Sequence, residues 1–235
     1  MRAFLILLLA PILGQAQTVY TKPDTIIVKD PEMKGLEHWM IRGYKGAMKA
    51  QGDMLNQQKN GAWREYNEGN GMLLKMEEFK AGKRNGAVIV IGSSGSLASD
   101  ETFVNDKLSG QRSTYNTGGR TKLIENYTDG KLNGMRRAYY ENTKVQEEGM
   151  WTDGERNGKT TWFLQSGFPS LEYTYKNGTL DGPSISYDEK GVKTQEGQFV
   201  NNLEDGEWKV YQDSALVKKV YYKEGKVVKE VPVKK

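Results

Sequence analysis

A glycine recurs every 24 residues through most of the chain, and this period constrains the fold more than any other feature of the sequence. The glycines in step with the period are Gly86, Gly110, Gly134, Gly158, Gly182 and Gly206. The residues four positions before them are Gly82, Asp106, Gly130, Gly154, Gly178 and Asn202. Gly, Asp and Asn tolerate a positive φ, so these positions select backbone geometry. A fixed interval of about 20 to 50 residues indicates stacked copies of one structural unit.

Aromatic residues follow the same period in two rows. The first row, five residues after each repeating glycine, is Ile91, Tyr115, Tyr139, Phe163, Tyr187 and Tyr211. The second row closes each unit and is Phe79, Phe103, Tyr127, Trp151, Tyr175 and Phe199. An earlier unit begins at Asn60-Gly61, and the next closing aromatic after Phe199 is Tyr222. We count seven units from about residue 56 to residue 222, with partial units on either side.

Each unit is predicted to be a β-hairpin, because Tyr, Thr, Val and Ile are dense in two short runs separated by turn residues. In the unit that begins "YTDGKLNG", residues 131–140 and 145–151 are the two expected strands, with Asn142-Thr143 between them. Asp129-Gly130 is expected to link neighbouring units as a tight two-residue turn. Pairing across the hairpin sets Trp151 opposite Gly134, so that the ring lies over a position without a side chain.

The predicted fold class is all-β: an elongated antiparallel meander of about seven stacked 24-residue β-hairpin repeats in one open, twisted sheet. With only 37% hydrophobic residues, 27 Gly and 13 Tyr, the chain cannot build a thick aliphatic core. Strict alternation would place Tyr127 and Tyr139 on opposite faces of the sheet. We expect a bulge at Asn133-Gly134 that adds one residue and brings both rings to one face. Two strands per unit, about 4.8 Å apart, predict a sheet about 70 Å long.

The first sixteen residues are typical of a secretory signal peptide. Arg2 precedes an unbroken apolar run, residues 3–13, which is too short to span a bilayer as a helix. Small residues at Gly14 and Ala16 predict cleavage between Ala16 and Gln17. An uncleaved anchor is the alternative. The remaining chain is expected to divide into an N-terminal extension or cap at 17–45, the repeat array at 46–222, and a Lys-rich C-terminal cap or tail at 223–235.

Charge and cysteine content limit the compartment and the partners. The formal charge of +4 is spread through the chain and is too weak to indicate nucleic-acid binding. Without cysteine there is no lipid-attachment residue and no disulfide. We therefore expect a secreted or periplasmic protein that is not transmembrane after signal removal. The Lys-rich end, residues 218–235, is either a charged edge that blocks strand pairing or a contact for anionic lipid or polymer.

The sequence gives little support for catalysis or for a cofactor. His38 is the single histidine, so neither a His-based triad nor a zinc site has a plausible residue set. The segment "IGSSGSL" aligns with the hairpin turns of other units and matches no phosphate-binding motif. The Asp-Gly turns offer too few carboxylates for calcium. We interpret Glu77, Glu101 and Glu125 as a row of solvated strand residues rather than hydrolytic carboxylates. The prediction is a non-enzymatic protein without cofactor or metal.

Three tryptophans are the candidate binding residues. Trp63, Trp162 and Trp208 are candidate surface aromatics that could stack on sugars or fill pockets of a partner. The alternative is that the rings simply build the sheet, and in a chain this poor in Leu and Ile it is the favoured one.

The units at residues 127–151 and 175–199 resemble the MORN-repeat variant of bacterial proteins labelled YwqK-like antitoxins, and the resemblance covers most of the chain after about residue 45. It implies a β-hairpin array for protein interaction or membrane contact, and the label implies neutralisation of a toxin. The export signal departs from a cytosolic antitoxin. We expect an exported module that binds another protein, with envelope polysaccharide or lipid binding through the aromatic sheet face as the alternative.

Overall fold

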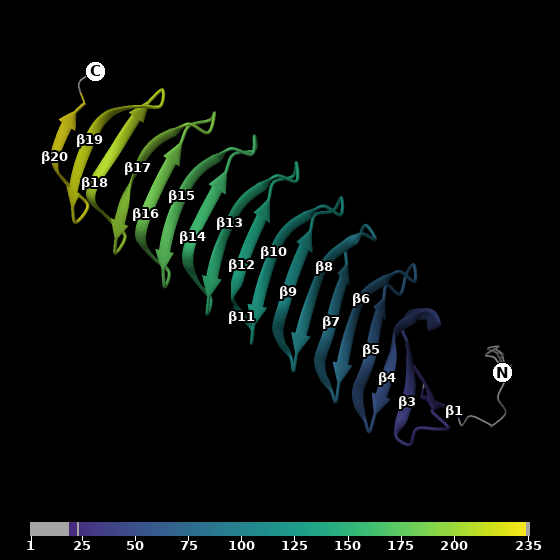
Figure 1. The fold of residues 1–235 in the computed structure, drawn as a ribbon. Helices are drawn as coiled ribbons and strands as arrows, with labels where there is room; N and C mark the ends of the chain where they lie inside the picture. Colours follow the sequence, from purple (N-terminus) through teal and green to yellow (C-terminus); the bar gives the residue numbers. More distant parts are fainter. Residues whose placement is uncertain (1–18, 23, 234–235) are drawn as a thin grey trace.

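The computed structural model describes residues 19–22 and 24–233, which form one β-sheet and a single 3-10 turn, η1 (Tyr44–Gly46) (Figure 1). The strands are β1 (Val19–Lys22), β2 (Thr25–Lys29), β3 (Leu36–Arg42), β4 (Met48–Leu55), β5 (Gln58–Tyr66), β6 (Leu73–Lys80), β7 (Lys83–Ile91), β8 (Leu97–Val104), β9 (Lys107–Tyr115), β10 (Thr121–Thr128), β11 (Lys131–Leu132), β12 (Gly134–Tyr139), β13 (Val145–Thr152), β14 (Glu155–Phe163), β15 (Pro169–Lys176), β16 (Thr179–Tyr187), β17 (Lys193–Val200), β18 (Leu203–Gln212), β19 (Ala215–Lys223) and β20 (Lys226–Pro232). The expected signal peptide and its cleavage site at Ala16 and Gln17 lie outside the described residues.

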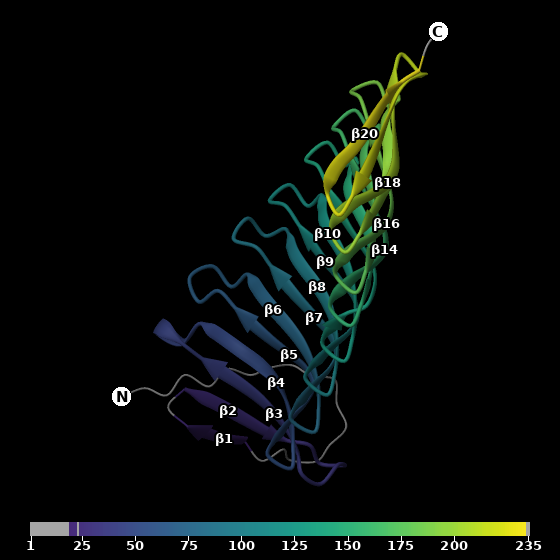
Figure 2. The ribbon, with the colours of Figure 1, turned by 90° about the vertical axis from the view of Figure 1, so that its left-hand side faces the viewer.

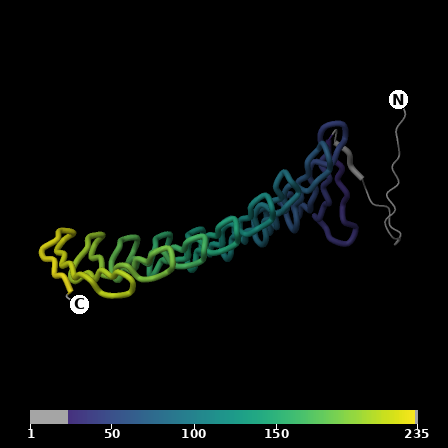
Figure 3. Tube along the Cα trace, turned by 90° about the horizontal axis from the view of Figure 1, so that it is seen from above, coloured from purple at the N-terminus to yellow at the C-terminus, as the bar shows by residue number. Residues whose placement is uncertain are grey.

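The strands follow one another across the sheet in chain order, and every pairing is antiparallel. β11 and β12 are two parts of one strand, because both pair with β10. β1 and β20 are the two edges, so the sheet is open. Figures 1, 2 and 3 show an elongated ribbon that twists along its length, with β1 and β20 at its opposite ends. The predicted fold class, an open antiparallel meander of β-hairpins, is confirmed.

Two kinds of turn connect the strands, one along each long edge of the ribbon. Between units, both central residues have positive φ, as at Asp129 (52°) and Gly130 (82°). This geometry twists in the same sense as the strands it joins. Within units, a longer turn places one residue at positive φ, and that residue is Gly71, Gly95, Gly119, Thr143, Gly167 or Gly191. The segment "IGSSGSL" is thus one of these turns, closed by the Gly92 N–H donating to Ser96 O at 2.8 Å. The turn between β18 and β19 differs, because Asp213 and Ser214 both have positive φ.

The repeating glycine lies in a bulge, as expected, but the bulge adds two residues rather than one. On β13 one residue separates Gly149 from Trp151, whereas on β14 three residues separate their partners, Thr160 and Arg156. An even number of additional residues leaves the alternation of side chains unchanged. The expectation that Tyr127 and Tyr139 share a face was therefore wrong.

The two aromatic rows lie on opposite faces. The Tyr127 hydroxyl donates to Glu125, whereas the equivalent of Tyr139 in another unit, Tyr115, donates to Asp100. Glu101 and Glu125 lie on the same side of the sheet, because both pair with Arg112. Asp100 is adjacent to Glu101 along the strand and therefore points to the other side. We call the side that carries Glu125 and the closing aromatics the Glu–Arg face, and the side that carries Tyr115 and Tyr139 the opposite face.

The predicted pairing of Trp151 with Gly134 is confirmed, and the other closing aromatics also stand opposite the repeating glycines. The ring, however, does not cover the glycine. A Cβ added at Gly134 would meet the Asn126 side chain at 3.2 Å and no atom of Trp151 within 4 Å. Rings cover glycines elsewhere, because a Cβ at Gly52 or Gly197 would meet the indole of Trp63 or Trp208. The prediction that the Trp151 ring lies over Gly134 was therefore wrong.

The ends of the array continue the same sheet. β1 to β3 add strands before the regular units, and β20 pairs with β19 at the far edge. β20 carries Lys226, Lys229 and Pro232, and its pairing is interrupted by a bulge opposite Tyr221 and Tyr222. Lysine, proline and bulges are features that discourage further strands from pairing with an edge. This arrangement supports the reading of the C-terminal segment as a protected edge.

We expect Gly197→Ala to destabilise the protein by about 2 kcal/mol, because a Cβ would lie 2.1 Å from Cδ2 of Trp208 and force the indole out of place. The measurement is urea unfolding followed by circular dichroism and tryptophan fluorescence. Gly118→Ala is the matched control, since the nearest atom to a Cβ there is 3.4 Å away and belongs to a flexible side chain. Equal effects of the two substitutions would contradict the close packing at Gly197.

Candidate interaction surfaces

A chain of alternating carboxylates and guanidinium groups runs across the middle of the Glu–Arg face. Each member comes from the next strand along the sheet, because Glu and Arg occupy successive cross-strand positions. The members, in order from β8 to β14, are Glu101, Arg112, Glu125, Arg136, Glu147 and Arg156. The successive nitrogen-to-oxygen distances are 3.1, 3.3, 3.3, 3.4 and 2.6 Å. We call these six residues the Glu–Arg ladder.

The ladder takes a diagonal step at β13. Gly149 is the cross-strand partner of Arg136 and occupies the position held by Glu101 and Glu125 in earlier units. Arg136 therefore pairs with Glu147, two residues from Gly149 along the strand. Glu147 in turn binds Arg156, whose guanidinium lies over the rings of Trp151, Trp162 and Tyr175. The last cation of the ladder is thus held by one carboxylate and three rings.

Glu125 is the most enclosed member of the ladder. Its side chain is only 9% exposed and accepts from Arg112, Arg136 and the Tyr127 hydroxyl. Burial and the Glu125 carboxylate raise the pKa of Tyr127 above its ordinary value. Burial disfavours the charged form of Arg112, but its hydrogen bonds with Tyr127 and Glu101 outweigh burial and raise its pKa. Each charged group of the ladder thus has a partner of opposite charge on a neighbouring strand.

The interpretation of Glu77, Glu101 and Glu125 as solvated strand residues was therefore wrong. Counted over the whole residue, Glu77 and Glu125 are only 8% and 7% exposed, and the side chain of Glu101 is 17% exposed. Glu77 pairs with Lys75 at 2.8 Å, and the other two carboxylates share Arg112. Burial of these charges is acceptable only because each has a partner on the same face. Sequence reasoning missed the arginines, although the recurrence of Arg two residues after Gly110 and Gly134 was a usable signal.

The prediction of Trp63 and Trp208 as surface aromatics was also wrong. They are 5% and 4% exposed, because each ring lies against a glycine of the neighbouring strand. Trp162 is half-buried and packs edge to face on Tyr173. Edge-to-face contacts continue through Tyr173 and Phe199 to Trp208 and Tyr222, with centroids 5.3 to 5.9 Å apart. The rings build the sheet, which was the favoured alternative.

The exposed large apolar side chains on the strands of the regular array lie on the opposite face, spread from β8 to β18. They are Val104, Met135, Met150, Val200 and Leu203, each at least 40% exposed. The first four are adjacent along their strands to residues of the Glu–Arg face, so alternation places them on the other side. Leu203 lies on that side too, because it pairs directly with Val200. Met135 pairs with Met150, and Val200 pairs with Leu203, so these residues form two cross-strand apolar pairs.

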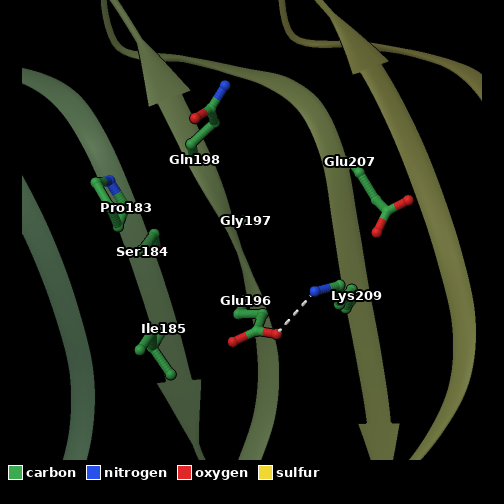
Figure 4. Close-up of a pocket in the computed structure, with 8 residues that line it drawn as sticks. All are labelled: Pro183, Ser184, Ile185, Glu196, Gly197, Gln198, Glu207 and Lys209. Atoms are coloured by element: carbon green, nitrogen blue, oxygen red, sulfur yellow. Dashed lines mark hydrogen bonds and ion pairs between the residues drawn. The ribbon is translucent and has the colours of Figure 1, made fainter.

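A shallow hollow of about 430 Å³ lies on the opposite face between β16 and β18. Figure 4 shows Glu196 joined to Lys209, with Glu207 on the same strand as Lys209. Glu196 also accepts from Lys193 at 2.7 Å and from the Tyr211 hydroxyl at 2.5 Å. These hydrogen bonds from Lys193 and Tyr211 lower the pKa of Glu196 to about 2. The hollow is therefore lined by charges that already have partners.

His38 lies on β3 at the N-terminal end of the opposite face. Its Nδ1 is 2.5 Å from Oδ1 of Asp53, and its side chain is 49% exposed. The residues around the pair include Gln51, Ala62 and Arg64 but no hydroxyl or thiol that could act as a nucleophile. Within residues 19–22 and 24–233, no three His, Cys, Asp or Glu side chains are close enough to hold a metal ion.

The same described residues contain no helix that is long and apolar enough to cross a bilayer. No family model and no curated protein matches the chain. Among solved structures, the chain is similar to a porin-like protein from Bacteroides uniformis, at 8% identity and a TM-score of 0.20, over 85% of this chain and 91% of that one. A TM-score this low carries no argument. The fold and its two faces define the chain as an open β-hairpin repeat protein.

We expect Glu125→Gln to cost about 2 kcal/mol of stability, because Arg112 and Arg136 would lose their shared carboxylate in the middle of the sheet. Urea unfolding followed by circular dichroism measures the effect. The matched control is Glu148→Gln on the opposite face, where the Glu148 and Arg137 side chains are both 35% exposed. That pair is expected to contribute less than about 1 kcal/mol. A Glu148 effect as large as the Glu125 effect would argue against a special role for the ladder.

The lowered pKa of Glu196 predicts an acid-sensitive contribution to stability. A carboxylate whose pKa falls on folding stabilises the native state above its unfolded pKa, and this contribution is lost as the pH falls toward the folded value. For Glu196 the window runs from its ordinary value of 4.5 down to about 2. Unfolding experiments across this range should show a weaker pH dependence in Glu196→Gln than in the wild type. Glu189→Gln, which removes an exposed loop carboxylate, should follow the wild-type profile.

Proposed function

We propose that the chain is an exported, non-enzymatic repeat protein that binds another protein through the opposite face of its sheet. The observation that carries this proposal is the placement of Val104, Met135, Met150, Val200 and Leu203 on that face, each at least 40% exposed. Apolar side chains gathered on one face are typical of a surface that a partner covers. The proposal places the protein in the periplasm or outside the cell.

The surroundings of these side chains are suited to a protein partner. Each apolar pair shares its two strands with a charged pair. Arg137 and Glu148 lie on the strands of Met135 and Met150, and Lys209 and Glu196 lie on the strands of Leu203 and Val200. Apolar contacts within a polar, charged setting are characteristic of interfaces between proteins that also exist apart. An extended sheet without a second layer offers this surface over several repeats at once.

The resemblance to the MORN-repeat variant of YwqK-like antitoxins supports a more specific form of the proposal. In this form the partner is a toxin or an envelope protein that is itself exported. The seven units in register support the repeat class, and the apolar pairs on the opposite face supply the binding surface. Neutralisation would then consist of covering the active surface of the partner rather than of any chemistry.

Binding of envelope polysaccharide or lipid through the aromatic rings has less support. The rings of Tyr173, Phe199 and Trp208 contact one another edge to face, and Arg156 covers three more. Stacking on sugars needs a free ring surface. This candidate is therefore kept as an outcome of the experiment below.

The test is affinity purification with residues 17–235 from the envelope fraction of the producing cell, followed by mass spectrometry. We expect one protein at a stoichiometric ratio, because the exposed apolar pairs on β12 and β13 and on β17 and β18 offer contacts at two places on the same face. Recovery of that protein should fall strongly with Met135→Asp combined with Met150→Asp, which places two charges in the centre of the proposed interface.

The matched control is Phe168→Asp, which changes an apolar side chain of similar exposure, 49%, in a loop outside the strands. It should leave recovery unchanged. Retention on glycan or anionic liposomes without a protein partner would favour the alternative class. Loss of the partner with Phe168→Asp and not with the Met135 and Met150 variant would move the interface to the loop edge of the ribbon.

A further inference from the structure

An apolar hollow of about 380 Å³ lies on the Glu–Arg face where the first strands meet the regular repeats. It is lined by Trp39, Ile41, Lys49, Ala50, Met54, Lys59, Trp63 and Glu65, which come from β3, β4 and β5. The hollows at Glu196 and His38 are lined mainly by polar and charged side chains, whereas this one has five apolar residues. Its volume falls in the range of sites that bind small molecules.

The walls of the hollow are held in place by hydrogen bonds. The Trp39 Nε1 donates to Oε2 of Glu37 at 3.0 Å, and the Trp63 Nε1 donates to the Asp53 carbonyl at 2.8 Å. Both indole N–H groups therefore have partners, and the half-buried Trp39 ring remains for apolar contact. Gly52 lies on the strand between those of Trp39 and Trp63. The buried Trp63 forms the floor of the hollow, because its ring lies over Gly52. A ligand would meet a preformed surface.

The charges around the hollow are arranged at its two ends. Lys59 pairs across the strands with Met54 at one end, and Glu65 pairs with Ala50 at the other, next to Lys49. The Lys59 Nζ lies 4.6 Å from the Trp63 ring centroid and 4.7 Å from that of Phe79. These rings fix the position of the Lys59 ammonium. Neither Lys59 nor Lys49 forms an ion pair with another described residue.

The lysines of the hollow thus differ from the cations of the Glu–Arg ladder, where every guanidinium has a carboxylate. A positioned ammonium without an ion pair, beside an apolar surface, is complementary to an anion attached to an apolar group. Glu65 disfavours a second negative charge at the far end of the hollow. The matching ligand therefore carries one anionic group and an uncharged body.

We propose that this hollow is a binding site for a small organic monoanion composed of an aromatic or branched aliphatic body and one carboxylate or sulfonate. The apolar body lies against Trp39, Ile41 and Met54, and the anionic group contacts the Lys59 ammonium. Such a site is independent of the protein-binding surface on the opposite face. Loss of one activity would leave the other intact.

The test is NMR titration of the tryptophan indole resonances of residues 17–235 with three probes of equal shape. 3-Phenylpropionate should give saturable shifts at Trp39 and Trp63, because it combines a ring with one carboxylate. 3-Phenylpropan-1-ol and 3-phenylpropylamine should bind at least about tenfold more weakly, since they lack the charge that meets Lys59. Comparable binding of all three probes, or no saturable shift with the carboxylate, would overturn the proposal.

Two variants place the binding in the hollow. Lys59→Gln should weaken 3-phenylpropionate binding by about tenfold through loss of the ammonium. Ala50→Phe should abolish binding by filling the hollow while leaving every charge in place. Lys122→Gln, which removes an exposed lysine of β10 that forms no ion pair with another described residue, is the matched control and should bind as the wild type does. Equal weakening by Lys59→Gln and Lys122→Gln would show only nonspecific charge attraction and reject the site.

Discussion

The bulge at each repeating glycine is the constraint on which the rest of the structure depends. Because it adds two residues to one strand, the alternation of side chains passes through it unchanged, unit after unit. Glu101 and Glu125 consequently point to the same side as Arg112 and Arg136, although they belong to different hairpins. A bulge of one residue would have reversed the faces at every unit and separated the ladder.

Constant faces give a single-layer sheet two different surfaces without a second layer to cover either. On the Glu–Arg face, paired charges and rings in edge-to-face contact supply the packing that an aliphatic core supplies elsewhere. Only Ile27, Trp63, Val88, Phe103, Trp208 and Val220 are buried apolar residues within the described part of the chain. The opposite face keeps its apolar side chains exposed. The proposed binding of a partner protein follows from this asymmetry.

The N-terminal end departs from the regular pattern in a useful way. Trp39 belongs to a strand before the repeats and pairs with Gly52. It lines the same hollow as Trp63, which belongs to the first full unit. The junction between the irregular strands and the array therefore has a hollow whose charges are unpaired. Where Trp208 lies beside Gly197 in the regular array, the strand on the other side of that glycine carries Ser184 in place of a tryptophan.

The 24-residue period of glycines and aromatics was enough to predict the hairpins, their turns, the pairing of Trp151 with Gly134 and the open meander, because these depend on local backbone geometry. It could not predict which rings are exposed or which carboxylates are paired. Those outcomes depend on the number of residues in the bulge and on contacts between strands far apart in sequence. Trp63 is buried because Gly52 lies beside it, and Glu125 is stable because two arginines from neighbouring strands reach it. Only the tertiary structure brings those partners together.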